Sequence, residues 1–227
     1  MQHGSALGAR TGGRDHPANG DDYQASGWQR KHHAIAAAAL VLFARDGYER
    51  TSVDAIAAEA GVSKRTVYSH YGDKESLFLL VLRETYDTMR ERVGDIVDRN
   101  LRDVDDLRSA LTTCMGEIVR TITRAPERAT LVRLLMSEAP HFPAILDLWH
   151  NRGIVSVIAE PLAKLTAAGL LDTDDPAQAA EHLFALTLGQ VNDKSMMGTI
   201  QLTHSEADRI IVSGIAVFMR AYATAAR

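Results

Sequence analysis

The stretch that decides the fold is residues 51–74, which read TSVDAIAAEAGVSKRTVYSHYGDK. With residue 53 as the first position of a twenty-residue helix-turn-helix, the positions that such a unit buries hold apolar side chains: Ile56, Ala60, Val62 and Val67. Gly61 falls in the turn, where a residue without a Cβ can adopt a left-handed conformation. The eighteenth position holds His70, which is less apolar than the pattern requires, and we expect the neighbouring Tyr71 to supply that packing. The stretch therefore predicts a helical hairpin.

The second helix of this hairpin begins with hydroxyls and cations. We expect Ser63 to cap it, and Lys64, Arg65 and Thr66 follow in its first turn. The first turn of a recognition helix meets the base edges in the major groove of DNA, and its free N–H groups favour a phosphate. Side chains further along can hold the phosphate backbone: Tyr68, Ser69, Tyr71 and Lys74. Each cation alone could belong to a solvated face, but their placement on a helix-turn-helix favours DNA binding.

The composition is that of a helical globular protein. Hydrophobic residues make up 46% of the 227-residue chain and charged residues 24%, while aromatic residues are only 6%. Ala and Leu are abundant and alternating runs of β-branched residues are nearly absent, so we expect an all-α protein. No apolar run reaches the length of a membrane span and no signal sequence is recognisable, so we expect a cytoplasmic protein with no membrane partner.

The net charge of −4 does not exclude nucleic acid as a partner, because only the surface that faces the phosphates has to be positive. Residues 28–75 contain seven Lys or Arg and six Asp or Glu, so this segment carries +1 and the remainder −5. The single cysteine, Cys114, cannot form an internal disulfide. We expect it to be a small buried hydrophobe, with a redox sensor as the alternative.

The chain divides into three parts around this stretch. Residues 1–27 are rich in Gly and poor in large apolar side chains, so we expect a disordered tail. Residues 28–75 are expected to form the helix-turn-helix domain, with a first helix that ends at Asp46-Gly47 and Thr51 capping the next. Residues 76–227 are expected to form a second helical domain that a long fourth helix enters. Its later helices are predicted at 103–124, 127–138, 142–168, 176–196 and 205–225.

The run from Thr51 to Phe78 resembles the N-terminal DNA-binding domain of the tetracycline-repressor (TetR) family. The similarity includes a Phe-Ala-x-x-Gly-Tyr turn at 43–48, Ala-Gly-Val-Ser at 60–63 and Lys-Glu-x-Leu at 74–77. It implies an all-helical homodimer whose first three helices bind a palindromic DNA operator, and whose remainder binds a small-molecule ligand and dimerises. Members of this family mostly repress transcription and release the operator when the ligand binds.

The resemblance also implies roles for single residues. It makes Lys64 and Arg65 the base readers, and we expect Arg65 to carry this chain's own specificity. The phosphate contacts that it implies are Thr51, Thr66, Tyr68, Tyr71 and Lys74. Ligand binding would shift the fourth helix, whose first residue Lys74 touches the DNA-binding domain, and so move the two recognition helices apart. Residues 131–192 are similar to the regulatory domain of one TetR subfamily.

The C-terminal part supplies candidates for a ligand cavity. Such sites are mostly apolar and contain a few polar groups that orient the ligand. By composition the candidates are Met115, Met136, Phe142, Trp149, His150, His182, Phe184, Leu188 and Met196. Further polar groups are His141, Asn151, Gln190 and Asn192. Any one of these side chains could equally belong to the ordinary core or surface.

Two apolar stripes in the last helices predict a dimer surface. The first stripe comprises Leu183, Leu186, Thr187, Gln190 and Val191, and the second comprises Ile210, Ile211, Gly214, Ile215, Val217, Phe218 and Tyr222. The second stripe is broader than burial on one side of a helix requires. We therefore expect a four-helix interface between two copies, whose twofold symmetry would match a palindromic operator.

An enzyme is the main alternative to a DNA-binding regulator. The sequence contains no GxGxxG or GxxxxGK[ST] loop, no GxSxG elbow and no HExxH helix, and its histidines lack the spacing of a metal site. We therefore expect no catalytic residues, no cofactor and no metal. A helical protein–protein adaptor whose hairpin never touches DNA is the second alternative.

Overall fold

The computed structural model describes residues 20–124, 126–146 and 153–224. These residues are helical apart from turns and one isolated bridge between Leu171 and Ala223, which confirms the all-α prediction. The elements are α1 (Gly20–Arg50), α2 (Val53–Glu59), α3 (Lys64–Tyr71), α4 (Lys74–Leu101), α5 (Leu107–Arg124), α6 (Pro126–Glu138), α8 (Ile154–Ala167), α9 (Pro176–Phe184), the π-helix η1 (Ala185–Gly189), α10 (Gln190–Lys194) and α11 (His204–Tyr222). None of these helices is long and apolar enough to cross a membrane.

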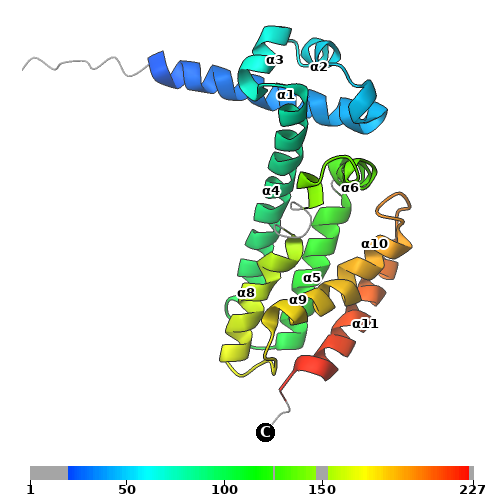
Figure 1. The fold of residues 1–227 in the computed structure, drawn as a ribbon. Coiled ribbons are helices and arrows are strands. Elements are labelled where there is room, and N and C mark those ends of the chain that lie inside the picture. Colours follow the sequence, from blue (N-terminus) through cyan, green and yellow to red (C-terminus); the bar gives the residue numbers. More distant parts are fainter. Residues whose placement is uncertain (1–19, 125, 147–152, 225–227) are drawn as a thin grey trace, which may run out of the picture.

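The helices form two groups joined by α4 (Figure 1). At one end α1 lies across the molecule and carries α2 and α3. From there α4 runs into the second group, where α5 and α8 pack against it and α11 packs against α5 and η1. The single long helix α4 therefore belongs to both groups, as the sequence predicted.

Helix α1 begins earlier than the sequence predicted. Residues 20–27, expected to belong to a disordered tail, form the first turns of α1, while residues 1–19 lie outside the described residues. A helix that packing has already nucleated gains one hydrogen bond for each residue added, so it can extend beyond its buried segment. The predicted stop is confirmed, because Gly47 leaves the helical conformation with φ 80° and ψ 168°.

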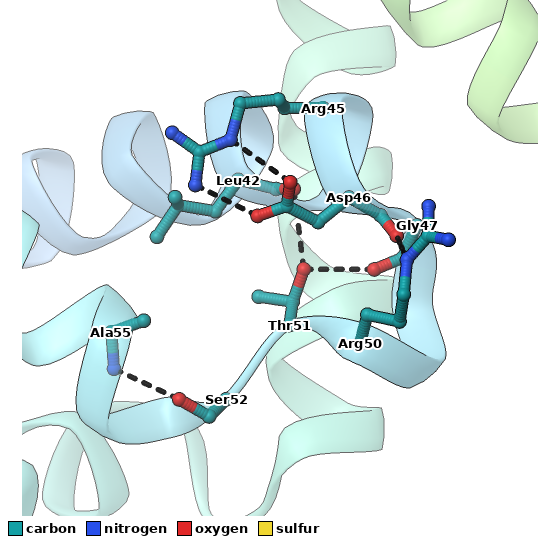
Figure 2. A network of polar contacts seen from close by, with 8 residues as sticks. All are labelled: Leu42, Arg45, Asp46, Gly47, Arg50, Thr51, Ser52 and Ala55. Atoms are coloured by element: carbon teal, nitrogen blue, oxygen red, sulfur yellow. Dashed lines mark hydrogen bonds and ion pairs between the residues drawn. The ribbon is translucent and has the colours of Figure 1, made fainter.

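The turn between α1 and α2 is held by a hydroxyl that the sequence analysis assigned incorrectly (Figure 2). Thr51 was expected to cap α2, but the cap is Ser52, whose Oγ accepts the N–H of Ala55 at 3.1 Å. The hydroxyl of Thr51 turns back instead and lies 2.8 Å from the carbonyl oxygen of Gly47 and 3.2 Å from that of Leu42. A donor beside the end of α1 satisfies carbonyls that the helix itself leaves without partners.

Helix α4 starts at a strong cap. The carboxylate of Asp73 accepts the N–H of Ser76 at 2.7 Å, and this hydrogen bond lowers the pKa of Asp73. An aspartate at this position also interacts favourably with the helix dipole. The cap therefore fixes where α3 ends and where α4 begins.

The buried side chains form two clusters, and the boundary between them does not fall at residue 75. The N-terminal cluster joins α1, α2 and α3 to the first half of α4, including Leu82 and Tyr86. It also contains Leu131, Leu134 and Leu135 of α6. The second cluster is built from the rest of α4 with α5, α8, α9, α10 and α11. Helix α6 is thus part of the core of the N-terminal group.

The later helices agree with the predicted segments except at two places. Within the predicted helix 142–168, residues 144–146 are helical, but Gly153 has an extended conformation and α8 begins at Ile154. Ile145 belongs to the N-terminal cluster and Phe142 packs against it. Helix α8 continues through Pro161, which has no N–H and so removes one helical hydrogen bond without ending the helix. The predicted helix 176–196 is divided into α9, η1 and α10.

Helices α11 and η1 approach each other at Gly214. A Cβ at this position would lie 2.1 Å from the carbonyl oxygen of Leu186 and 3.0 Å from Cγ2 of Thr187. No side chain larger than hydrogen fits at such a distance. The widened backbone of η1 therefore packs directly on the backbone of α11.

Candidate nucleic-acid interface and ligand cavity

Helix α3 presents a row of polar side chains on the surface of the N-terminal group. Ser63 caps it as predicted, and its Oγ accepts the N–H of Thr66 at 3.1 Å. The hydroxyls of Ser63 and Thr66 are 2.8 Å apart. One turn on, the side chain of Tyr68 is 41% exposed, and the Ser69 hydroxyl donates to the carbonyl oxygen of Thr66. These groups leave oxygen and N–H atoms on the outer face of the first two turns.

The two predicted base readers differ in their surroundings. Lys64 Nζ donates to Asp54 of α2 at 2.7 Å, and this contact raises the pKa of Lys64. Arg65 is exposed and makes no hydrogen bond or ion pair with the described residues. An arginine in this state can direct its N–H groups to a base or a phosphate without first leaving another partner.

Lys74 lies at the start of α4, on the edge of the same surface. Its Nζ is 4.3 Å above the centroid of the Tyr48 ring and donates to the carbonyl oxygen of Glu49 at 3.2 Å. A cation over an aromatic face is held by the ring quadrupole. The position of this ammonium group is therefore defined by the end of α1.

Two residues predicted to contact DNA are instead buried. Thr51 is 3% exposed, and its hydroxyl bonds the turn after α1. Tyr71 is 4% exposed, and its hydroxyl donates to the carbonyl oxygen of His32 at 3.1 Å. Neither hydroxyl can reach a phosphate without abandoning an internal bond. The packing role predicted for Tyr71 is confirmed, because Tyr71 belongs to the N-terminal cluster of buried side chains and His70 does not.

A column of stacked rings between α1 and α3 was not predicted from the sequence. Trp28 stacks on His70 with ring centroids 4.7 Å apart and on His32 at 5.0 Å, and His32 stacks on Tyr71 at 4.7 Å. His32 Nε2 also lies 2.8 Å from Glu84 of α4. Burial lowers the pKa of His70, so this ring prefers the neutral form. The i, i+4 spacing of Trp28 and His32 places both rings on one face of α1 and could have indicated this contact.

A cavity of about 120 Å³ lies between α4, α6, α8 and η1. Its wall is mostly apolar, with Asn192 as a polar group. Its lining comprises Tyr86, Met89, Leu131, Val132, Leu135, Gly153, Val155, Phe184, Leu188 and Asn192. Three of these residues come from α6, so the cavity touches the helix that is shared with the N-terminal core.

Few of the predicted ligand residues line this cavity. Phe184 and Leu188 do, as does the predicted polar group Asn192, whereas Trp149, His150 and Asn151 lie outside the described residues. Met115 is buried in the second core, and Met136 and Met196 are 58% and 64% exposed.

The other two predicted ligand residues are held elsewhere. Phe142 packs on Tyr48 and Phe78, with ring centroids 4.7 Å and 5.1 Å apart. Exposed His182 pairs with the hydroxyl of Tyr222. Composition could not separate cavity walls from core because both are apolar.

A larger hollow of about 510 Å³ lies between α5, α10 and α11. Polar and apolar side chains line it equally, among them Arg120, Thr203 and Asp208. It does not touch α6. Within the described part of the chain, no group of three or more His, Cys, Asp or Glu side chains is placed to hold a metal ion.

Cys114 is 1% exposed, and burial raises the pKa of its thiol to about 12. Thiols react as thiolates, so this environment favours the expected buried hydrophobe over a redox sensor.

The two stripes predicted to form a dimer surface are largely used within the chain. Most of their residues are buried between α9, η1, α5 and α11: Leu183, Thr187, Val191, Ile210, Ile211, Gly214, Ile215 and Phe218. The breadth of the second stripe is explained by contacts with both α5 and η1. The large apolar side chains of α11 that stay exposed are Val212, at 56%, and Val217, at 39%.

Family models match both groups of helices. A model described as bacterial regulatory proteins, tetR family, matches residues 35–81. A second model, described as the C-terminal domain of AefR-like transcriptional repressors, matches residues 109–224, about half of the chain by itself. The chain belongs to the TetR family of bacterial transcriptional regulators. The helix-turn-helix of α2 and α3 is accordingly the DNA-binding element of a transcriptional regulator.

Solved structures of the TetR family share this fold. A TetR-family regulator from Mesorhizobium loti has a TM-score of 0.79 and 28% identity, covering 87% of this chain and 98% of that protein. The flavonoid-responsive regulator FrrA has a TM-score of 0.65 and 28% identity, covering 87% of this chain and 100% of FrrA.

Relatives by sequence include the transcriptional repressor AcnR of Corynebacterium glutamicum. It is 40% identical over 151 residues, which are 64% of this chain and 71% of AcnR. Four other curated relatives, all HTH-type transcriptional regulators, match over only 28% to 57% of their own length. TetR-family proteins bind operator DNA and ligands and are typically dimeric.

Proposed function

We propose that this TetR-family chain is a repressor that binds a palindromic operator as a homodimer and is released when an apolar small molecule enters the cavity behind α6. The observation that carries the DNA-binding part is the exposed Arg65 on the first turn of α3, which has no partner among the described residues. Repression requires binding alone, so the proposal gives the protein no catalytic step.

The proposed DNA contacts follow from the exposed groups of α3 and α4. Lys64 and Arg65 would read base edges, and Ser63, Thr66, Tyr68 and Lys74 would hold phosphates. Because residues 28–75 carry a net charge of only +1, affinity would depend on a few placed groups in a symmetric pair. A dimer with about 6–10 phosphate contacts would still lose affinity steeply as salt rises.

The cavity between α4, α6, α8 and η1 is the proposed ligand site. Its lining is apolar apart from Asn192 and the partly polar Tyr86, which suits a small, mostly apolar ring compound. The relative FrrA is a flavonoid-responsive regulator, which agrees with an aromatic ligand class. The larger hollow beside α5 is the less favoured site because it does not touch α6.

The proposed dimer uses the outer face of α10 and α11. Val212 and Val217 stay exposed there, and Gln190 of α10 is exposed as well. Two copies related by a twofold axis would bury these side chains and present both α3 helices to one face of a palindromic duplex.

Selection of duplexes from a random-sequence pool would test the proposal directly. The wild-type chain should retain a palindromic sequence, and Arg65→Ala should weaken binding to it by about tenfold or more. Arg92→Ala, an exposed arginine midway along α4, should bind like wild type. Sedimentation should give a dimer for all three proteins. If no duplex is enriched over the starting pool, the chain is not a sequence-specific DNA-binding protein, and an adaptor or enzyme role must be considered.

A further inference from the structure

The end of α6 holds the turn that follows the first helix of the N-terminal group. Oε1 of Glu138, the last residue of α6, accepts the backbone N–H of Tyr48 at 3.1 Å. A Cβ at the preceding residue, Gly47, would come within 3.7 Å of the same oxygen. The carboxylate thus sits against the backbone where α1 leaves its helical path. Ninety residues of sequence separate Glu138 from this turn.

Tyr48 connects this contact to the DNA-binding surface. One face of its ring lies under the ammonium group of Lys74, 4.3 Å away, and the Lys74 ammonium also donates to Glu49. The rest of the ring packs on Phe78 at 5.0 Å and on Phe142 at 4.7 Å. The position of the Lys74 ammonium is therefore set by residues 48 and 49, whose backbone is held by Glu138.

We infer that Glu138, on the helix that walls the ligand cavity, is a positioning residue of the DNA-binding surface, acting through Tyr48 on Lys74. This inference rests on the proposed function, because it assumes that Lys74 contacts a DNA phosphate. A charge-assisted hydrogen bond to a backbone N–H is directional and stronger than a neutral one. It holds the Tyr48 backbone more narrowly than the aromatic packing alone, since stacked rings can slide.

The same residue gives the cavity a route to DNA. Leu131, Val132 and Leu135, on the preceding turns of α6, line the cavity. A displacement of α6 by a ligand moves Glu138 with it, because both belong to one helix. The Lys74 ammonium then loses its support without any change in α3. The turn after α1 is accordingly a second connection between the two groups of helices, besides α4 itself.

A double-mutant cycle between Glu138 and Lys74 tests the inference. Binding of the selected duplex would be measured over a range of salt for Glu138→Ala, Lys74→Ala and the double variant. Glu138→Ala should weaken binding by about tenfold and lower the salt slope by about one, the effect of one lost phosphate contact. The double variant should bind like Lys74→Ala, because both changes remove the same contact.

Two further variants separate positioning from a general loss of stability. Glu138→Gln keeps an acceptor oxygen and should recover most of the affinity that Glu138→Ala loses. Glu117→Ala removes a partly exposed glutamate whose carboxylate pairs with Arg99 at 3.0 Å, away from α1, and should leave DNA binding unchanged. Hydrogen exchange of the peptide spanning residues 44–52 should accelerate in Glu138→Ala alone, because the Tyr48 amide loses its acceptor.

The inference is overturned if Glu138→Ala keeps the wild-type affinity and salt slope. It is also overturned if the effects of Glu138→Ala and Lys74→Ala multiply, since the two residues then act independently. Neither result would affect the proposed function, which fails only if the wild-type protein enriches no duplex or if Arg65→Ala binds like wild type.

Discussion

At the scale of single residues, a threonine hydroxyl beside a helix end has several possible uses, and position decides among them. Thr51 follows Gly47, and the backbone turns there so that the Thr51 hydroxyl meets carbonyl oxygens of α1 (Figure 2). Ser52, one residue later, is then the residue aligned with the first N–H groups of α2. The sequence Thr-Ser before a helix offers two equivalent caps, and only the path of the preceding turn distinguishes them.

Replacing Thr51 by Val should therefore act on stability. The substitution leaves buried carbonyl oxygens without their donor, which costs about 1–3 kcal/mol in the free energy of unfolding. Thr51→Ser keeps the hydroxyl and should cost less. Thr112→Val is the matched control, because its hydroxyl donates to Arg108 on an exposed face where water can replace it. Urea unfolding followed by circular dichroism measures all three. A Thr51→Val protein as stable as wild type but weak on DNA would mean a direct DNA contact.

The ion pair between Lys64 and Asp54 should compete with DNA. Both side chains are about half exposed or more, so the pair adds little to stability and opens readily. Asp54→Asn frees the ammonium group and removes a negative charge near the phosphates, so it should tighten duplex binding by about twofold to fivefold at low salt. The gain should shrink as salt screens the pair. Fluorescence anisotropy titrations would measure it.

Glu59→Gln separates the freed lysine from the change in net charge. Glu59 is an exposed acid on the same helix, α2, and has no hydrogen bond to Lys64. If Glu59→Gln tightens binding as much as Asp54→Asn does, the effect is one of overall charge and Lys64 is not the group released.

At the scale of the helices, a glycine allows two backbones of the C-terminal group to pack directly on each other. Gly214→Ala would place a Cβ 2.1 Å from the carbonyl oxygen of Leu186, so α11 and η1 must separate. Overpacking of this kind costs about 1–3 kcal/mol or more. Gly116→Ala in α5 is the control, because its Cβ would meet only the flexible end of Arg120. That change should be neutral or stabilise by about 0.5–1 kcal/mol, since Gly is a poor helix former.

Thermal unfolding of the two glycine variants, together with sedimentation, measures both effects. Gly214→Ala should melt well below wild type and should also impair dimerisation, because the outer face of α11 moves with the helix. Equal melting temperatures for Gly214→Ala and Gly116→Ala would contradict the close contact between the two backbones.

The helix boundaries show what periodicity can and cannot predict. Apolar spacing placed α2, α3, α5, α6 and α11 within a few residues, because each buries one face against a neighbour. It missed the break at Gly153 before α8, because apolar residues on the two sides of the break, such as Ile145 and Ile158, enter different cores, which spacing does not distinguish. It also missed η1, because a single extra residue in a helical turn leaves the apolar stripe almost unchanged.

The site was predictable to the extent that it is local. Ser63 caps α3, Lys64, Arg65, Thr66 and Tyr68 lie on it, and Lys74 begins the next helix, so one recognised hairpin and its exit place these residues. Thr51 and Tyr71 were misassigned because burial depends on α1, which is distant along the chain. The cavity wall combines α4, α6, α8 and η1, so no window of sequence contains it. Glu138 went unnoticed for the same reason.

At the scale of the whole molecule, α6 is the element besides α4 that connects the N-terminal core to the cavity. Leu131 and Leu135 pack into the core below α1 and α2 and also line the cavity. Packed interiors do not deform smoothly, so a group added to the cavity must move one of its walls. Helix α6, which provides one of these walls, ends at Glu138, and the Glu138 carboxylate accepts a hydrogen bond from the backbone N–H of Tyr48. Filling the cavity should therefore have the same effect as ligand binding.

Val132→Phe supplies such a filling group from α6, and Val155→Phe supplies one from α8 on another wall of the cavity. Each should weaken binding of the selected duplex by about 5-fold to 150-fold, the range of ordinary allosteric coupling. The combination should add little, because one aromatic ring already occupies the space. Ala163→Phe, on the exposed face of α8, adds the same group to solvent and should bind DNA normally. Melting temperature and sedimentation would verify that each protein remains a folded dimer.

Wild-type affinity in a folded Val132→Phe protein would contradict release through this cavity. The release site would then be the larger hollow beside α5, where Arg120 and Asp208 would be the groups to alter next.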